Sequence, residues 1–325
     1  MFLLFTHAKD YYTIDLVKSS LEQEGYQSIR LNTDEFPSKI EISKCFGTHQ
    51  HDSICYQDNL IYAKDIEGVW LRKFFSPVID SSIDPRYGEG CFNESLEVIK
   101  GFFYTLNNIT WIDPFRNVYH ARNKSLQLQV AERIGLKIPK TLVTNSKAGL
   151  EEFYSSNNGN IVVKMQTTLS TSMQGGGMFL HTSKVTNDDI KDAELVSFCP
   201  LMFQELIEKQ YELRVIYIDG NFFTGKIDTS KTALGKIDCR LASPDDVYWQ
   251  EYQLPESTCK AITQYMNAMG LMFGAIDLIK TPNNEYVFLE VNPTGEWGML
   301  QRDLGYPIAE AIASTLINRT KNKKR

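Results

Sequence analysis

Two apolar segments near the C-terminal end carry polar side chains within sequences that otherwise read as buried strands. Asp277 lies in Ala-Ile-Asp-Leu-Ile, and Glu290 and Asn292 lie in Phe-Leu-Glu-Val-Asn-Pro. Because side chains alternate along a strand, Glu290 and Asn292 share one face. A carboxylate buried without a partner is costly. The two segments therefore predict neighbouring strands whose side-chain oxygens meet a cation.

The chemistry of these side chains indicates which cation. Two carboxylates and one amide are hard oxygen ligands, which suit Mg²⁺ bridging the phosphates of a nucleotide. Asp277, Glu290 and Asn292 are therefore the predicted metal ligands. An ion pair with a nearby arginine is the alternative explanation for the carboxylates.

Two features upstream favour phosphate binding. Lys164 lies in the strand-like segment Ile-Val-Val-Lys-Met, where a cation is costly unless it meets an anion. The loop at residues 171–177 ends in three glycines, which let backbone N–H groups approach phosphate oxygens. The loop lacks the ending of a P-loop. An exposed strand lysine and a flexible hairpin are the respective alternatives.

A further segment is suited to the nucleoside. Phe203-Gln-Glu-Leu-Ile reads as a strand that runs into a hinge, whose backbone could meet an adenine edge. Glu212 follows seven residues after Glu205 and could accept both ribose hydroxyls. Arg214 shares a strand face with Glu212. An ordinary pair of charged strands explains the segment equally well.

The N-terminal third predicts an α/β unit. An apolar strand at Phe2–Thr6 precedes a helical pattern at Tyr12–Gly25 and a second strand at Ser28–Leu31, an order typical of parallel sheets. Residues 40–65 alternate and indicate hairpins. A strand begins at Gly68, and Glu89–Leu106 reads as a helix.

Composition limits the classes of protein. A chain of 325 residues predicts two or three domains. The net charge of −6 argues against bulk nucleic-acid binding. Apolar runs are far shorter than the roughly 18–20 residues of a membrane span. The six cysteines are widely spaced without a metal motif, which favours reduced thiols in a cytoplasmic protein.

Taken in order along the chain, these motifs resemble those of ATP-grasp carboxylate–amine ligases. The matching elements run from Asn123-Lys124-Ser through Lys164, Gln204-Glu-Leu-Ile and Glu212-Leu-Arg214 to Asp277 and Glu290-Val-Asn292-Pro. The resemblance covers the whole chain, and its most specific part is the Asp…Glu-x-Asn-Pro element. It implies an α/β (α+β) ATP-grasp fold that binds ATP and Mg²⁺.

The sequence is more closely similar to the peptide macrocyclases that mature microviridin-type graspetides. Shared stretches include Thr6-His-Ala-Lys-Asp, Leu31-Asn-Thr-Asp-Glu-Phe-Pro, Val69-Trp-Leu-Arg and Phe288-Leu-Glu-Val-Asn-Pro-Thr-Gly-Glu. Asp238-Cys239-Arg240 departs from the family, which often has an aromatic residue between the aspartate and the arginine. The charged pair survives, so only the packing at this point is affected.

This resemblance implies three domains. Residues 1–118 would form a pre-ATP-grasp α/β domain, residues 119–205 a central lid domain, and residues 206–325 a C-terminal domain with a mixed sheet.

The resemblance also implies a reaction. ATP would phosphorylate a side-chain carboxylate of a precursor peptide, and a Ser/Thr hydroxyl or a Lys amine of the same peptide would close an ester or amide ring. Positioning and charge neutralisation would supply the catalysis. The resemblance implies that Lys124 and Lys164 bind the phosphates, that Glu205, Leu206 and Ile207 frame the adenine, and that Glu212 binds the ribose. It implies that Asp277, Glu290 and Asn292 hold two Mg²⁺ ions. Arg214 and Arg240 would stabilise the acyl phosphate or the tetrahedral species. A structural ion pair is the alternative for each arginine.

Partners follow from the same resemblance. A leader peptide would guide the substrate, and the acidic segment Thr186–Glu194 is a candidate docking site, although a solvated helix start explains it equally well. Arg72 could face the site, with an exposed strand arginine as the alternative. Related enzymes imply a homodimer. The competing functions are a ligase that adds amino acids to a protein or peptide carboxylate, and a regulatory module that binds nucleotide without turnover.

Overall fold

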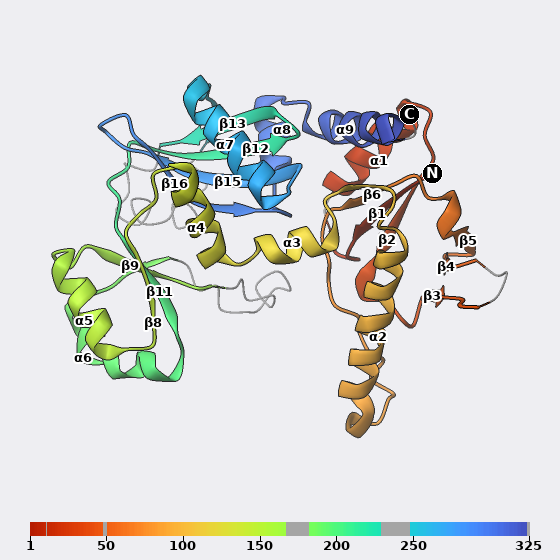
Figure 1. Ribbon diagram of the computed structural model, residues 1–325, viewed down its shortest axis with the longest axis horizontal. Helices are drawn as coiled ribbons and strands as arrows, with labels where there is room; N and C mark the ends of the chain where they lie inside the picture. Colours follow the sequence, from red (N-terminus) through yellow and green to blue (C-terminus); the bar gives the residue numbers. More distant parts are fainter. Residues whose placement is uncertain (11, 48–50, 167–181, 229–247, 324–325) are drawn as a thin grey trace.

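The computed structural model describes residues 1–10, 12–47, 51–166, 182–228 and 248–323. Its first sheet is parallel, with the strand order β2-β1-β6-β7 (Figure 1). The strands are β1 (Phe2–Thr6), β2 (Ser28–Asn32), β6 (Gly68–Leu71) and β7 (Thr110–Ile112). The strand–helix–strand pattern at the N-terminus therefore predicted the parallel unit correctly.

Both faces of this sheet are covered, which explains why β1 is apolar at successive positions. Phe2 and Leu4 pack with α1 (Thr13–Gln23) and α9 (Ile308–Lys323) on one face. Leu3 and Phe5 pack on the other face. The elements there are α2 (Pro85–Thr105) and the antiparallel sheet of β3 (Ile40–Ser43), β4 (Ser53–Tyr56) and β5 (Asn59–Tyr62).

A second sheet lies in the middle of the chain, with the order β10-β9-β11-β8. Its strands are antiparallel: β8 (Thr141–Thr144), β9 (Ile161–Lys164), β10 (Ser183–Lys184) and β11 (Leu201–Glu205). Figure 1 shows α5 (Lys147–Ser156) and α6 (Asn187–Lys191) beside it. A separate core, which includes Leu150, Ile161 and Phe203, joins these elements to the 3-10 helix η4 (Ala193–Phe198).

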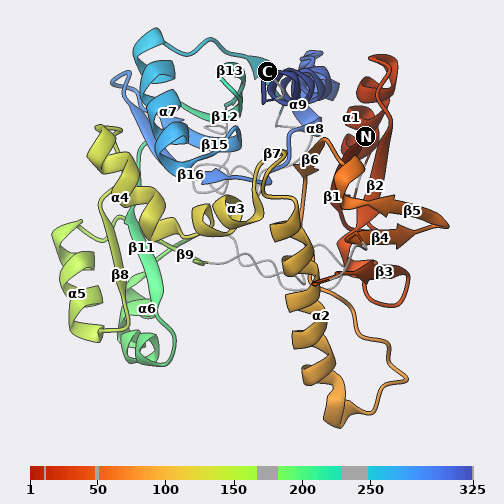
Figure 2. The same ribbon diagram turned by 45° about the vertical axis from the view of Figure 1, so that its right-hand side comes forward.

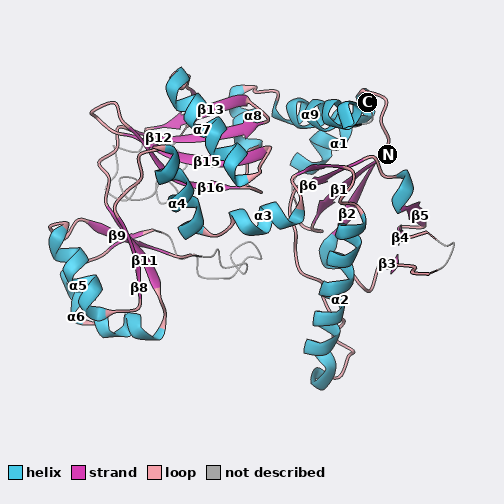
Figure 3. Ribbon diagram, in the orientation of Figure 1, coloured by secondary structure: helices cyan, strands magenta, loops and turns pink. Residues whose placement is uncertain are grey.

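The third sheet has the order β14-β13-β12-β15-β16 (Figure 3). Its antiparallel strands are β12 (Tyr211–Ile218), β13 (Asn221–Ile227), β14 (Gln250–Glu251), β15 (Phe273–Lys280) and β16 (Tyr286–Asn292). An isolated parallel bridge joins Lys137 to Val287. One face packs on α4 (Lys124–Ile134) and α7 (Glu256–Met269), and the other on α8 (Gly298–Leu304).

The helix α3 (Phe115–Ala121) connects the first sheet to α4, as Figure 2 shows. Asp113, which precedes α3, is buried, and its carboxylate accepts bonds from the N–H groups of Met272 (2.8 Å) and Phe273 (3.0 Å). The residues after β7 are thereby tied to the start of β15. No helix among the described residues is long and apolar enough to span a membrane.

The helix α2 begins one turn earlier than the predicted Glu89. Pro85 occupies its first position, and the Asp84 side chain accepts a bond from Arg86 N at 2.9 Å. An aspartate followed by proline is a strong helix start, which the sequence analysis overlooked.

Candidate active site

Three charged side chains form a row across the third sheet. Arg214 on β12 lies opposite Asp277 on β15, and Asp277 lies opposite Glu290 on β16. Arg214 Nη1 donates to Asp277 Oδ1 at 2.7 Å. The structure thus brings together residues that the sequence analysis identified separately, and the arginine pair named there as an alternative is present.

A β-bulge sets the direction of Glu290. The register shifts between Asp277 and Leu278, so Leu278 pairs with Phe288 rather than with residue 289. Phe288 and Val291 consequently both face the core although they are three residues apart. Glu290 is left on the opposite face beside Asp277, in keeping with the role of bulges in re-aiming side chains.

Two lysines from other elements reach this row. Lys124, in the first turn of α4, places Nζ 2.9 Å from Glu290 Oε2 and donates to the carbonyl oxygen of Met165 at 3.0 Å. Lys164, at the end of β9, lies close enough to Glu290 to lower its pKa. The second and third sheets and α4 therefore meet at Glu290.

The two carboxyl groups differ electrostatically. Burial, together with the negative charge of Glu290, raises the pKa of Asp277 although Arg214 opposes the shift. Burial also disfavours the ionised form of Glu290, but Lys124 and Lys164 outweigh it and the pKa of Glu290 is lowered. Their side chains are 36% and 33% exposed, so this face of the sheet is open to a ligand.

Asn292 ends β16 and is exposed on the Glu290 side of the strand. Its Oδ1 accepts a bond from Thr294 N at 3.0 Å. In the described part of the chain, no group of three or more histidine, cysteine, aspartate or glutamate side chains is arranged to hold a metal ion, so a cation here would draw on two carboxylates and an amide. Such an oxygen set fits Mg²⁺.

The predicted nucleoside residues lie at the junction of the second and third sheets. Glu205 ends β11, and its carboxylate accepts a bond from Lys140 N at 2.9 Å. Leu206 N donates to Asn160 O at 2.8 Å, and Ile207 follows before β12. Glu212 pairs with Lys209, a nearly buried lysine that the sequence analysis missed. Arg240 and the loop at residues 171–177 lie outside the described residues.

Arg72 is buried rather than exposed, and it belongs to a charged cluster that joins the first sheet to the turn after Asn292. Its Nη1 donates to the carbonyls of Thr294 (2.9 Å) and Gly295 (3.1 Å), and its Nη2 lies 2.5 Å from Glu296 Oε2. Lys73 Nζ lies 2.5 Å from Glu296 Oε1 and 3.5 Å from Asp10 Oδ1. We call Asp10, Arg72, Lys73 and Glu296 the junction cluster.

The junction cluster touches the charged row through the main chain. Arg214 Nη2 donates to the carbonyl oxygen of Glu296 at 3.2 Å. The same guanidinium therefore contacts Asp277 and the turn that the junction cluster holds. Asp10, Lys73 and Glu296 were not assigned from the sequence, because nothing local shows that they meet.

The segment proposed for leader docking is a capped helix start. Thr186 and Asp189 form a reciprocal capping box at α6, and Asp188 pairs with Lys191 at 2.6 Å. The Asp189 carboxylate is therefore occupied by the helix N-terminus.

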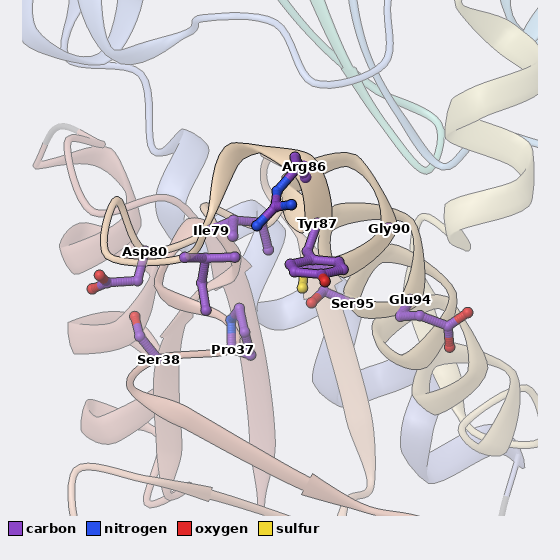
Figure 4. A pocket seen from close by; sticks show the side chains of 11 residues that line it. Pro37, Ser38, Ile79, Asp80, Arg86, Tyr87, Gly90, Glu94 and Ser95 are labelled. Atoms are coloured by element: carbon purple, nitrogen blue, oxygen red, sulfur yellow. The ribbon is translucent and has the colours of Figure 1, made fainter.

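A surface groove of about 690 Å³ lies away from the charged row (Figure 4). It runs between the N-terminal half of α2, residues 79–83 and the turn at Pro37–Ser38, and it is mostly apolar. All of its lining belongs to the N-terminal third of the chain.

Two family models match the sequence. Residues 1–119 match the MvdD pre-ATP grasp domain, and residues 121–316 match the RimK-like ATP-grasp domain. The chain belongs to the ATP-grasp ligase family. The predicted ATP-grasp fold is confirmed, and so is the prediction of an ATP-dependent ligase.

Solved structures resemble the ligase over almost all of its length. Macrocyclase MdnC of Microcystis aeruginosa MRC, bound with precursor peptide MdnA, is 32% identical with a TM-score of 0.87, over 98% of this chain and 99% of that one. Macrocyclase MdnB of the same organism is 38% identical with a TM-score of 0.84, over 97% and 98%.

A RiPP-associated ATP-grasp ligase of Chryseobacterium gregarium, in complex with ADP and a leader and core peptide, is 27% identical with a TM-score of 0.88, over 98% of this chain and 96% of that one. No curated protein sequence matches the ligase.

Proposed function

We propose that the ligase is a leader-guided peptide macrocyclase. A side-chain carboxylate of a precursor peptide attacks the γ-phosphorus of ATP, which releases ADP and forms an acyl phosphate. A Ser/Thr hydroxyl or a Lys amine of the same peptide then attacks the acyl carbon. Phosphate leaves, the nucleophile loses a proton, and an ester or amide closes the ring.

The observation that carries this proposal is the charged row with its two lysines. Lys124, Lys164 and Arg214 approach two carboxylates from three different elements, on a face open to solvent. A triphosphate needs both cationic side chains and a metal-binding oxygen set, and this face supplies both. The lysines would hold the phosphates, and Arg214 would stabilise the acyl phosphate or the tetrahedral species.

Asp277, Glu290 and Asn292 would hold Mg²⁺. The bound ions would supply Lewis-acid stabilisation of the charge on the transferred phosphoryl group. When nucleotide and metal enter, Lys124 would exchange its contact with Glu290 for a phosphate oxygen. Arg214 also donates to the carbonyl oxygen of Glu296, and this contact would keep the guanidinium oriented in that state.

The hinge after β11 would frame the nucleoside. Glu205, Leu206 and Ile207 would lie along the adenine, and Glu212 would accept the ribose hydroxyls. The pair between Lys209 and Glu212 supports this role, because it holds the carboxylate of Glu212 in place at the start of β12. Arg240 is proposed as the second arginine at the acyl phosphate.

The remaining assignments belong to the same proposal. The substrate is a microviridin-type precursor, the enzyme is a cytoplasmic homodimer, and its three domains divide near residues 118 and 205. The cysteines support a reducing compartment, since Cys55, Cys91, Cys199 and Cys259 are free thiols.

Mass spectrometry tests the reaction. The ligase is incubated with ATP, Mg²⁺ and the MdnA peptide, and we expect the peptide to lose one water per ring while ADP is released. A gain of mass in the presence of free amino acids would instead identify an amino-acid-adding ligase. Binding of ATP without turnover on any peptide would identify a regulatory module and would contradict the proposal.

A further inference from the structure

A buried glutamine lies behind the proposed metal ligands. Gln127 is 2% exposed and follows Lys124 by one turn on α4. Its Nε2 donates to the carbonyl oxygens of Val291 (2.9 Å) and Ala121 (2.7 Å), and its Oε1 accepts from Val291 N at 2.9 Å. Val291 is the residue between Glu290 and Asn292.

The contacts between Gln127 and Val291 resemble those that a neighbouring strand would make at the outer edge of β16. β16 is the last strand of its sheet among the described residues, so the N–H and C=O groups on its outer edge have no partner in a described strand. The side-chain amide of Gln127 supplies both a donor and an acceptor to Val291, as a neighbouring strand would. Further back along the same edge, Phe288 N donates to Lys137 O at 2.7 Å. The outer edge of β16 is thus held at two points.

The position of this contact bears on the metal site. Val291 packs its side chain into the core, while Glu290 and Asn292 project from the opposite face. Two hydrogen bonds to the backbone between them limit the rotation of the strand about its axis, and that rotation would move both side-chain oxygens together. The N-terminal part of α4 therefore makes two contacts with this strand: Lys124 contacts the Glu290 side chain, and Gln127 holds the backbone next to it.

We propose that Gln127 is a positioning residue for the Mg²⁺ ligands Glu290 and Asn292. The inference rests on the proposed function, because it requires that these side chains bind the metal. Residues that orient metal ligands typically change metal affinity by about 10–100-fold when they are replaced. Loss of a buried amide that only stabilised the fold would instead change stability and leave the metal requirement as it was.

The test compares Gln127→Met, which keeps the length of the side chain, with Gln129→Met, an exposed position on the same helix. The Mg²⁺ dependence of ATP binding is measured by calorimetry, well below the unfolding midpoint of each variant. Hydrogen exchange at the Val291 amide is measured on the same samples. We expect Gln127→Met to need at least about tenfold more Mg²⁺ and to exchange faster at Val291. Gln129→Met should match the wild type in both.

A third variant, Glu290→Gln, separates the two levels of the argument. If Glu290→Gln loses the Mg²⁺ dependence while Gln127→Met retains the wild-type requirement, Gln127 is structural only. The positioning role of Gln127 is then rejected, and the metal assignment stands. If Glu290→Gln itself retains the wild-type requirement, the metal assignment falls and takes the inference with it. Gln127→Asn guards against misfolding, because it keeps a neutral amide in the core while its shorter side chain no longer reaches Val291. It should need more Mg²⁺ than the wild type, and an unchanged requirement in this variant would also overturn the inference.

Discussion

The charged row and the junction cluster use the same kinds of side chain in two different settings. Arg214, Asp277 and Glu290 lie on a face where the carboxylates are about one-third exposed. In the junction cluster, Asp10 has no exposed side-chain surface and Arg72 has 1%, and only Glu296 is as exposed as Asp277 (36%). Burial opposes the ionised form of Asp10, but Arg72 and Lys73 outweigh it, and its pKa is lowered. At Asp277 the effect of burial outweighs that of Arg214, so the pKa of Asp277 is raised.

The difference teaches what separates a structural ion cluster from a site that exchanges ligands. In the junction cluster each carboxylate meets both cations at close range, and the charges cancel within it. In the charged row, Asp277 and Glu290 lie opposite each other and each forms an ion pair with a cation of its own, so an added cation would relieve the repulsion between the two carboxylates. An exchangeable site needs this unbalanced arrangement, whereas a junction between sheets is stabilised by the balanced one.

Breaking the junction cluster should give the largest effect. Arg72→Met leaves the buried Asp10 with one cation and removes the donors to Thr294 and Gly295. We expect a loss of about 3–5 kcal/mol in the free energy of unfolding, measured with denaturant. Lys18→Met, which removes an exposed pair with Glu22 on α1, is the matched control and should cost less than about 0.5 kcal/mol. Equal stability of the two variants would show that the junction cluster does not stabilise the fold.

Changing the charged row should affect turnover rather than stability. Glu290→Gln removes one carboxylate from a partly exposed site, and we expect turnover to fall by about a hundredfold or more with little change in the unfolding midpoint. Glu285→Gln alters the exposed Lys137–Glu285 pair next to β16 and should retain wild-type turnover. A wild-type rate in Glu290→Gln would refute the metal assignment.

Asp113 sharpens the comparison, because it is a buried carboxylate held by main-chain N–H groups rather than by cations. Burial, opposed by those two N–H donors, raises its pKa to about 7. The folded state therefore binds a proton that the unfolded state releases between about pH 4 and pH 7, so the contribution of Asp113 to stability falls as pH rises through this range.

The test uses Asp113→Asn, which removes this titration and one acceptor, at a cost of about 1–3 kcal/mol. We expect the stability advantage of the wild type to be smaller at pH 8 than at pH 5, measured by urea unfolding. The exposed Gln129→Met is the control: it removes no titratable group, so its difference from the wild type should vary little with pH. An advantage that stayed constant for Asp113→Asn would contradict the raised pKa.

The smallest expected effect is a weakening of ATP binding when Lys164, next to the charged row, is replaced. Lys164→Ala should weaken ATP binding by about tenfold, because it removes one of several positive charges near the phosphates. Lys184→Ala removes an exposed lysine from the neighbouring strand β10 and should bind ATP as the wild type does. If both variants bound ATP equally well, Lys164 would have no phosphate role.

The parts of the structure that local patterns determine were predictable. The segments around Asp277 and Glu290 were correctly predicted as neighbouring strands, because short apolar runs are a local signal. The helix α8 was missed, since it has seven residues and no side-chain cap at Trp297. The bulge in β16 was also missed, because alternation alone gives no sign of an extra residue.

The site was predictable as a set of residue types but not as a set of contacts. Carboxylates in apolar strands pointed to Asp277 and Glu290, because isolated burial of such groups is costly. Their partners depend on how distant elements pack. Arg72 and Glu296 are 224 residues apart, and neither segment contains a sign of the other. In the sequence, Gln127 and Gln129 are two glutamines separated by one residue, and nothing local distinguishes them. Only the packing of α4 shows that Gln127 is buried and Gln129 exposed.

The position of α9 has a consequence for the order of events during synthesis. Ile308, Ile312 and Leu316 cover the face of the first sheet formed by Phe2, Leu4 and Trp70. A ribosome makes the strands of that sheet well before it makes α9, which completes the cover. Until α9 has been made, part of this apolar face is exposed to water, where a chaperone that binds apolar segments would contact it.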